Sequence, residues 1–180
     1  YCGAPCSPAY EYGYKCGGIL MVGFCRFIHE HAQRTNAEKV LFFARDGYIM
    51  KKIYDQIYPD AATEYVYWSR AAAAKLCAQL YPQDYFRRFL DQKTGRGIPL
   101  KEIFRSMGIS SMQLDFPEDE VLTEQNLPAI KAELYKRLPE IGALYQPMYA
   151  QADKYLNGIL GGCKRAVTVD CGWAGSGRIF

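Results

Sequence analysis

Two aspartates each follow a short apolar run that is typical of a buried strand. Asp46 comes after residues 40–43, and Asp170 comes after residues 166–169. Runs of this length, rich in β-branched and aromatic residues, predict strands of a parallel sheet. Because the carboxyl ends of parallel strands open onto one crevice, we expect both carboxylates at the same edge of the sheet. Carboxylate oxygens suit Mg²⁺, so we assign Asp46 and Asp170 to acid/base catalysis and to metal binding.

A third predicted strand supplies groups that suit a phosphate. It ends in Ser69 and Arg70, and the alanines at 71–74 then start a helix, so Ser69 is expected at the N-cap. A phosphoryl group needs charge neutralisation from cations and backbone donors. We therefore assign three groups of residues to substrate binding: the end of this strand, the two neighbours of Asp46, and the glycine-rich turn after Asp170. They are Ser69 and Arg70, Arg45 and Gly47, and Gly172, Trp173, Gly175 and Ser176.

These residues also have ordinary structural explanations. An aspartate after a strand often caps the following helix, and an Asp-Gly pair is common in turns. Trp173 could stack on a sugar or base, or it could cover the sheet edge. The 172–177 turn has neither the Walker pattern nor the Gly-x-Gly-x-x-Gly pattern of dinucleotide-binding loops. Both interpretations stay open from the residues alone.

The elements that must position these residues follow from the periodicity of the sequence. We expect residues 1–12 to be a connecting segment and a helix to run from Tyr14 to Thr35, with its apolar part 16–25 buried. The segment 81–128, broken by glycine and proline, predicts a helical insertion that acts as a cap or lid. Two further helices, split near Pro139, lead to the last strand. The whole chain, 1–180, is thus expected to form a single α/β domain.

Composition excludes several classes of protein. The chain has 180 residues, of which 49% are hydrophobic and 23% charged, so it is expected to be globular rather than disordered. Its net charge of +3 is spread along the chain, which does not favour a nucleic-acid partner. The longest uncharged apolar stretch is too short to cross a bilayer. Seven scattered cysteines fit a reducing cytoplasm, and the missing initial methionine indicates a piece of a longer chain.

Four motifs in this order resemble a bacterial family of haloacid dehalogenase-like (HAD-like) hydrolases that occur with polysaccharide-building glycosyltransferases. They are YGYKCGGILMVGFCRFIHEHAQ, KVLFFARDGYIMKKIYD, EYVYWSRAA and VDCGWAGSG, and they leave the middle of the chain poorly matched. The resemblance implies a parallel Rossmann-like sheet flanked by helices. It also implies a Mg²⁺-assisted phosphate-ester hydrolase or phosphotransferase in surface-polysaccharide metabolism. The implied ligand is a phosphorylated sugar or nucleotide-sugar, and the implied partner is a glycosyltransferase domain or subunit.

The chain departs from the HAD pattern at one position. HAD phosphotransferases carry Asp-x-Asp-Gly after the first strand, with the earlier aspartate as nucleophile, and Ala44 stands at that position here. Asp46 matches the second aspartate, the acid/base. Three functions therefore stay open: an enzyme that uses Asp46 differently, a non-catalytic module that binds a phosphate or nucleotide-sugar, and a purely structural interaction domain.

Overall fold

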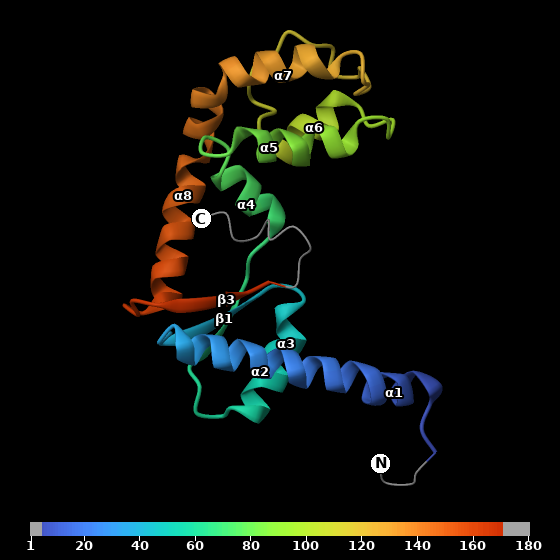
Figure 1. The fold of residues 1–180 in the computed structure, drawn as a ribbon. Helices are drawn as coiled ribbons and strands as arrows, with labels where there is room; N and C mark the ends of the chain where they lie inside the picture. The colour runs from blue at the N-terminus through green and yellow to red at the C-terminus, as the bar shows by residue number, and fades with distance from the viewer. Residues whose placement is uncertain (1–4, 171–180) are drawn as a thin grey trace. The chain divides into compact units, whose positions relative to one another are not determined.

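The protein is described from a computed structural model that covers residues 5–170 (Figure 1). These residues fall into two compact units. The first unit contains residues 5–68 and 156–170, and the second contains residues 69–155. The segment 81–128, expected to form a cap or lid, lies wholly within the second unit.

The first unit is built on a three-stranded parallel sheet. In residues 5–170 the sheet consists of β1 (Lys39–Phe43), β2 (Thr63–Val66) and β3 (Ala166–Val169), in the order β2-β1-β3. Phe43 lies opposite Val66 on one side, and Phe42 lies opposite Val169 on the other. The prediction of a mixed α/β fold with parallel strands is confirmed.

Two helices cover one face of this sheet. They are α2 (Gly18–Arg34) and α3 (Gly47–Ile57), and they share a buried apolar cluster with β1 and β3. Its members are Cys25, Ile28, Ala32, Val40, Phe42, Met50, Tyr54 and Val169. Burial of these side chains fixes the helices against the strands and sets the direction in which the α3 N-terminus points.

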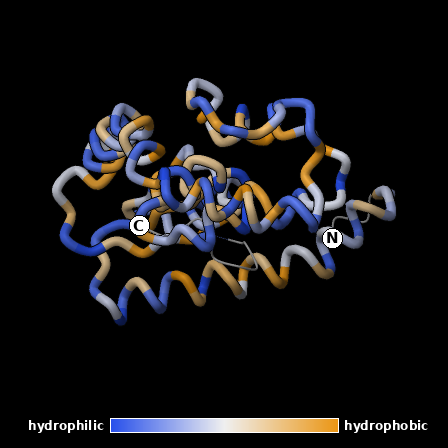
Figure 2. The backbone as a smooth tube through the Cα atoms, turned by 90° about the horizontal axis from the view of Figure 1, so that it is seen from above, coloured by the Kyte–Doolittle hydropathy of each residue, from blue (hydrophilic) through white to orange (hydrophobic). Residues whose placement is uncertain are grey.

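Two predictions for the N-terminal part of the chain are wrong. The first is the connecting segment, since α1 (Pro8–Tyr12) begins with Ser7 as N-cap and continues through the π-helical η1 (Gly13–Gly17) into α2. The second is the buried helix over residues 16–25, where apolar residues recur along the helix (Figure 2) but most of their side chains are exposed. Ile19 is 72% exposed and Leu20 is 71% exposed. Hydropathy alone predicted burial, but the sheet is only long enough to cover the second half of α2, from Cys25 onward.

The second unit is helical and has an apolar core of its own. It contains α4 (Arg70–Leu76), α5 (Pro82–Phe89), the short 3₁₀ segment η2 (Asp91–Lys93), α6 (Leu100–Met107), α7 (Leu127–Lys136) and α8 (Leu138–Leu160) as far as Tyr155. Fully buried members of its core include Tyr85, Leu90, Ile103, Met107, Ile130 and Ile141. Each of α5 to α8 buries apolar side chains in this core, and on α6 Ile103 and Met107 are at helical spacing.

The end of α8 follows its sequence signals. Gly161 and Gly162 have φ values of 57° and 83°, in the left-handed region that residues with a Cβ rarely adopt. The glycine pair ends α8 and leads the chain into β3. No helix within residues 5–170 is long and apolar enough to span a membrane.

Candidate functional site

The turn from β1 to α3 presents Asp46 at the carboxyl end of the central strand. The backbone N–H of Ala44 donates to the Val66 carbonyl at 2.9 Å, so the ladder with β2 continues one residue beyond β1. Asp46 occupies the N-cap position of α3, is exposed, and its side chain makes no capping hydrogen bond. In the described part of the chain, its carboxylate forms no hydrogen bond or ion pair. The capping explanation for Asp46 is therefore wrong, and the carboxylate is available to a ligand.

Gly47 has a structural reason to be glycine. A Cβ at this position would lie 2.9 Å from the Phe42 carbonyl carbon and 3.1 Å from the Phe42 Cβ. The first turn of α3 thus packs directly on the backbone of β1, as a glycine allows in other helix–strand turns of open α/β sheets. This close approach explains the Asp-Gly pair, and contact of Gly47 with a substrate stays a prediction.

Asp170 lies at the end of the strand next to β1. Because Val169 is opposite Phe42, the next residue along β3 lies beside Phe43. The fold therefore brings Asp46 and Asp170 to the same edge of the sheet, in the segments that follow adjacent parallel strands, as the sequence predicts. Asp170 is half-buried, whereas Asp46 is exposed.

The two carboxylates fit the donors that Mg²⁺ takes from proteins. Mg²⁺ is usually held by one or two carboxylates, with water and substrate phosphate completing an octahedron. Asp46 and Asp170 supply that number, and the Asp46 carboxylate has no competing partner among residues 5–170. No group of three or more His, Cys, Asp or Glu side chains in the same residues is arranged to hold a metal.

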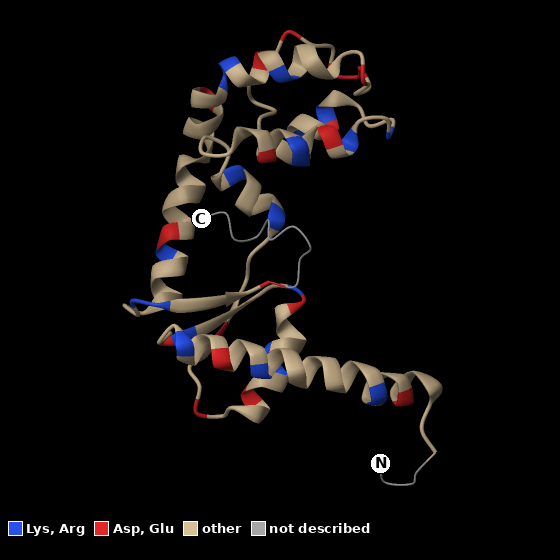
Figure 3. Cartoon of the chain, viewed as in Figure 1, with Lys and Arg blue, Asp and Glu red and all other residues tan. Residues whose placement is uncertain are grey.

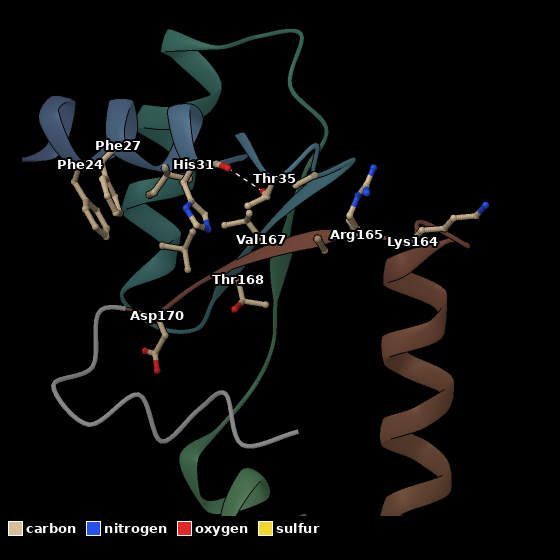
Figure 4. Close-up of a pocket in the computed structure, with 13 residues that line it drawn as sticks. Phe24, Phe27, His31, Thr35, Lys164, Arg165, Val167, Thr168 and Asp170 are labelled. Carbon is tan, nitrogen blue, oxygen red and sulfur yellow. Dashed lines mark hydrogen bonds between the residues drawn. The ribbon is translucent and has the colours of Figure 1, made fainter. Parts of the chain in front are cut away.

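A pocket of about 670 Å³ lies beside Asp170, between α2 and β3 (Figure 4). Phe24, Phe27 and His31 line its helical wall, and Thr168 and Asp170 belong to its strand wall. The three rings follow one another along α2, with centroid distances of 6.2 Å from Phe24 to Phe27 and 6.3 Å from Phe27 to His31. Such a wall can cover the apolar face of a sugar or a base next to the carboxylate.

The sequence alone does not reveal this pocket. The spacing of Phe24, Phe27 and His31 places them on one side of a helix, which is a recognisable signal. It is also the signal of an ordinary core face. The two cases differ only in whether another element covers that face, which the local sequence does not encode.

Ser69 and Arg70 belong to the second unit. The Ser69 hydroxyl oxygen accepts a hydrogen bond from the Ala72 N–H at 3.0 Å, so the predicted N-cap is confirmed. A hydroxyl that accepts one bond can still donate its proton to an anion. Arg70 is exposed, as is Arg45 in the first unit. A shared site of Ser69 and Arg70 with Asp46 and Asp170 stays a prediction.

The remaining predicted substrate-binding residues, Gly172, Trp173, Gly175 and Ser176, lie outside the described residues. No family model, curated protein or solved structure matches this chain. The HAD-like resemblance therefore rests on the sequence motifs alone.

Proposed function

We propose that this chain is a HAD-like phosphate-ester hydrolase or phosphotransferase that uses Mg²⁺ and acts in surface-polysaccharide metabolism. The observation that carries the proposal is the Asp46 carboxylate, which is exposed and unbonded among residues 5–170 and stands at the strand end next to that of Asp170. The proposed substrate is a phosphorylated sugar.

Each candidate residue has its own role in the proposed reaction. Asp46 takes the proton of the attacking water or hydroxyl, since Ala44 excludes an aspartyl-phosphate at the usual position. Asp46 and Asp170 would hold Mg²⁺, which when bound would neutralise charge on the phosphoryl oxygens. Ser69 and Arg70 supply a hydroxyl and a cation that suit a phosphate, and the aromatic wall of Phe24 and Phe27 suits the apolar face of a sugar.

The proposal is tested by measuring phosphate release from a panel of sugar phosphates with and without Mg²⁺. Asp46→Asn should lower the turnover number by about 100-fold or more, because general acid/base groups contribute on that scale. Asp60→Asn is the matched control, since Asp60 is also exposed but precedes β2, at the opposite end of the strands. Turnover that survives Asp46→Asn would contradict the proposal.

A second function, a non-catalytic module that binds a phosphate or nucleotide-sugar within a glycosyltransferase assembly, is favoured by Ala44. It predicts binding without turnover. Calorimetric titration with a nucleotide-sugar separates the two functions, because the module should bind with equal affinity in Mg²⁺ and in chelator. A strong gain in affinity with Mg²⁺ would support the enzyme.

A further inference from the structure

The first helices of the chain form an arm that extends beyond the sheet. α1, η1 and the first turns of α2 follow one another without a break, and we call their residues 8–24 the arm (Figure 1). Between Lys15 and Arg26 the chain carries no charge (Figure 3). Each of these two cations already has an acid partner, Glu11 for Lys15 and Glu30 for Arg26. A helix that is apolar on all its sides is normally covered in a folded protein.

The arm exposes more apolar area than a monomer usually does. Large apolar side chains of the arm and of the turn that follows it are exposed, from 37% for Phe24 to 73% for Tyr12. They are Tyr10, Tyr12, Tyr14, Ile19, Leu20, Val22, Phe24 and Phe27. At about 200 Å² for a fully exposed aromatic side chain, they present on the order of 900 Å² per chain, whereas the largest apolar patch of a typical monomer is about 300–600 Å². If two copies each cover about half of this area, the contact buries about 900 Å², the size of a weak, reversible interface.

One side of this helix is complementary to itself when a second copy lies antiparallel. Its contact stripe consists of Gly17, Leu20, Phe24 and Phe27, whose spacing is that of the contact positions between two paired helices. The stripe is symmetric about Val22. In an antiparallel pair, each Phe27 therefore lies opposite Gly17 of the second copy, and each Phe24 lies opposite Leu20 of the second copy. A Cβ at Gly17 would meet nothing within 4 Å, so a phenylalanine ring can lie against the backbone there.

The packing of α2 within the chain leaves this stripe open to a partner. The helix buries Cys25, Ile28 and Ala32 against the sheet, and none of them belongs to the stripe. The rings of Phe24 and Phe27 lie parallel to within 11°, with 6.2 Å between their centroids. Two parallel rings side by side make a flat apolar wall, which suits a helix turn that carries glycine.

We propose that two copies of the ligand-free chain form a dimer in which the contact stripes pack antiparallel. Both copies use the same surface, so the contact closes at two chains. Phe24 and Phe27 also line the pocket beside Asp170, so a sugar bound there and the second copy would exclude each other. The dimer goes beyond the proposed function, because it needs neither Asp46 nor Mg²⁺. A monomeric chain would leave the proposed enzyme standing, and an inactive chain would leave the dimer standing.

The experiment is analytical ultracentrifugation of the whole chain, without sugar phosphate or Mg²⁺, at about 1 to 300 µM, the range that a weak interface requires. The mass should rise from 20.5 kDa towards twice that value. Leu20→Glu should raise the dissociation constant of the dimer by about tenfold or more, because it places a charge in each half of an apolar contact. Ile19→Glu is the matched control and should change the constant by less than about twofold. Ile19 is as exposed as Leu20, but adjacent residues of a helix do not share a face.

The two glycines at the start of α2 offer a second matched pair. A Cβ at Gly17 would meet nothing within 4 Å, and one at Gly18 would make only an ordinary contact at 3.8 Å, so both positions accept a side chain in the monomer. Gly17→Gln should weaken the dimer by about tenfold or more, because the new side chain occupies the space of Phe27 of the second copy. Gly18→Gln should change the dissociation constant by less than about twofold. A wild type that stays monomeric, or equal effects within either pair, would overturn the inference.

An exchange of charges tests the antiparallel register. Because Leu20 lies opposite Phe24 of the second copy, a mixture of Leu20→Glu chains and Phe24→Lys chains should dimerise about tenfold more tightly than either variant alone. Both substituted residues are exposed, so each variant should keep the wild-type melting temperature, which excludes misfolding as the cause of weak association. A mixture that associates no better than the single variants would contradict the antiparallel pair.

Discussion

Replacement of Gly47 by alanine should destabilise the first unit, although alanine favours helices. The new Cβ would lie 2.9 Å from the Phe42 carbonyl carbon, within the central strand, which is paired with a neighbour on each side. These main-chain atoms cannot move aside without disturbing the hydrogen bonds to both neighbouring strands. We therefore expect the steric clash to lower the free energy of unfolding by about 3 kcal/mol, at the upper end of what overpacking usually costs. The higher helix propensity of alanine offsets at most about 1 kcal/mol of this loss. The net loss in the free energy of unfolding is therefore about 2 kcal/mol.

Gly23→Ala is the matched control. Gly23 lies within α2, and a Cβ there would meet nothing within 4 Å. The same substitution should therefore stabilise the protein by about 0.5 to 1 kcal/mol. Urea unfolding followed by circular dichroism measures both variants, and hydrogen exchange of the β1 amides reports on the first unit directly. If Gly47→Ala stabilises the protein as Gly23→Ala does, the close-packing argument is refuted.

Two predictions concern buried tyrosines. Tyr145→Phe removes a hydroxyl that forms a hydrogen bond with the Tyr85 hydroxyl at 2.7 Å and donates one to the Met107 carbonyl. The free energy of unfolding, measured in urea, should therefore fall by about 2 to 3 kcal/mol. Tyr135 is exposed, so the control Tyr135→Phe should change it by less than about 0.5 kcal/mol. Burial also raises the pKa of Tyr145 and of Tyr54 to about 12, above the usual value near 10. Their contribution to stability is therefore complete below about pH 10 and is lost as the pH rises towards about 12. Urea unfolding across this range should show the decline, and a flat profile would contradict it.

Local signals in the sequence determined the turns that carry the candidate residues. Ser69 caps α4 because its hydroxyl reaches the Ala72 N–H three residues on, and Gly161 and Gly162 end α8 because they adopt left-handed backbone. Asp46 follows β1 because a buried apolar run ends where α3 must begin. Each of these features depends on contacts within a few residues, so single-sequence patterns predict them well.

Tertiary structure decided which distant residues became neighbours. Asp170 reaches the edge that carries Asp46 only because β3 pairs with β1, across more than 120 residues of chain.

Dependence on tertiary packing also explains why the prediction of a buried helix over residues 16–25 is wrong. Ile19 and Leu20 have the hydropathy of core residues, but burial requires a partner surface, and α2 extends beyond the sheet that covers Cys25 and Ile28. Periodicity thus determines which side of a helix is apolar. What covers that side is a property of the packed fold.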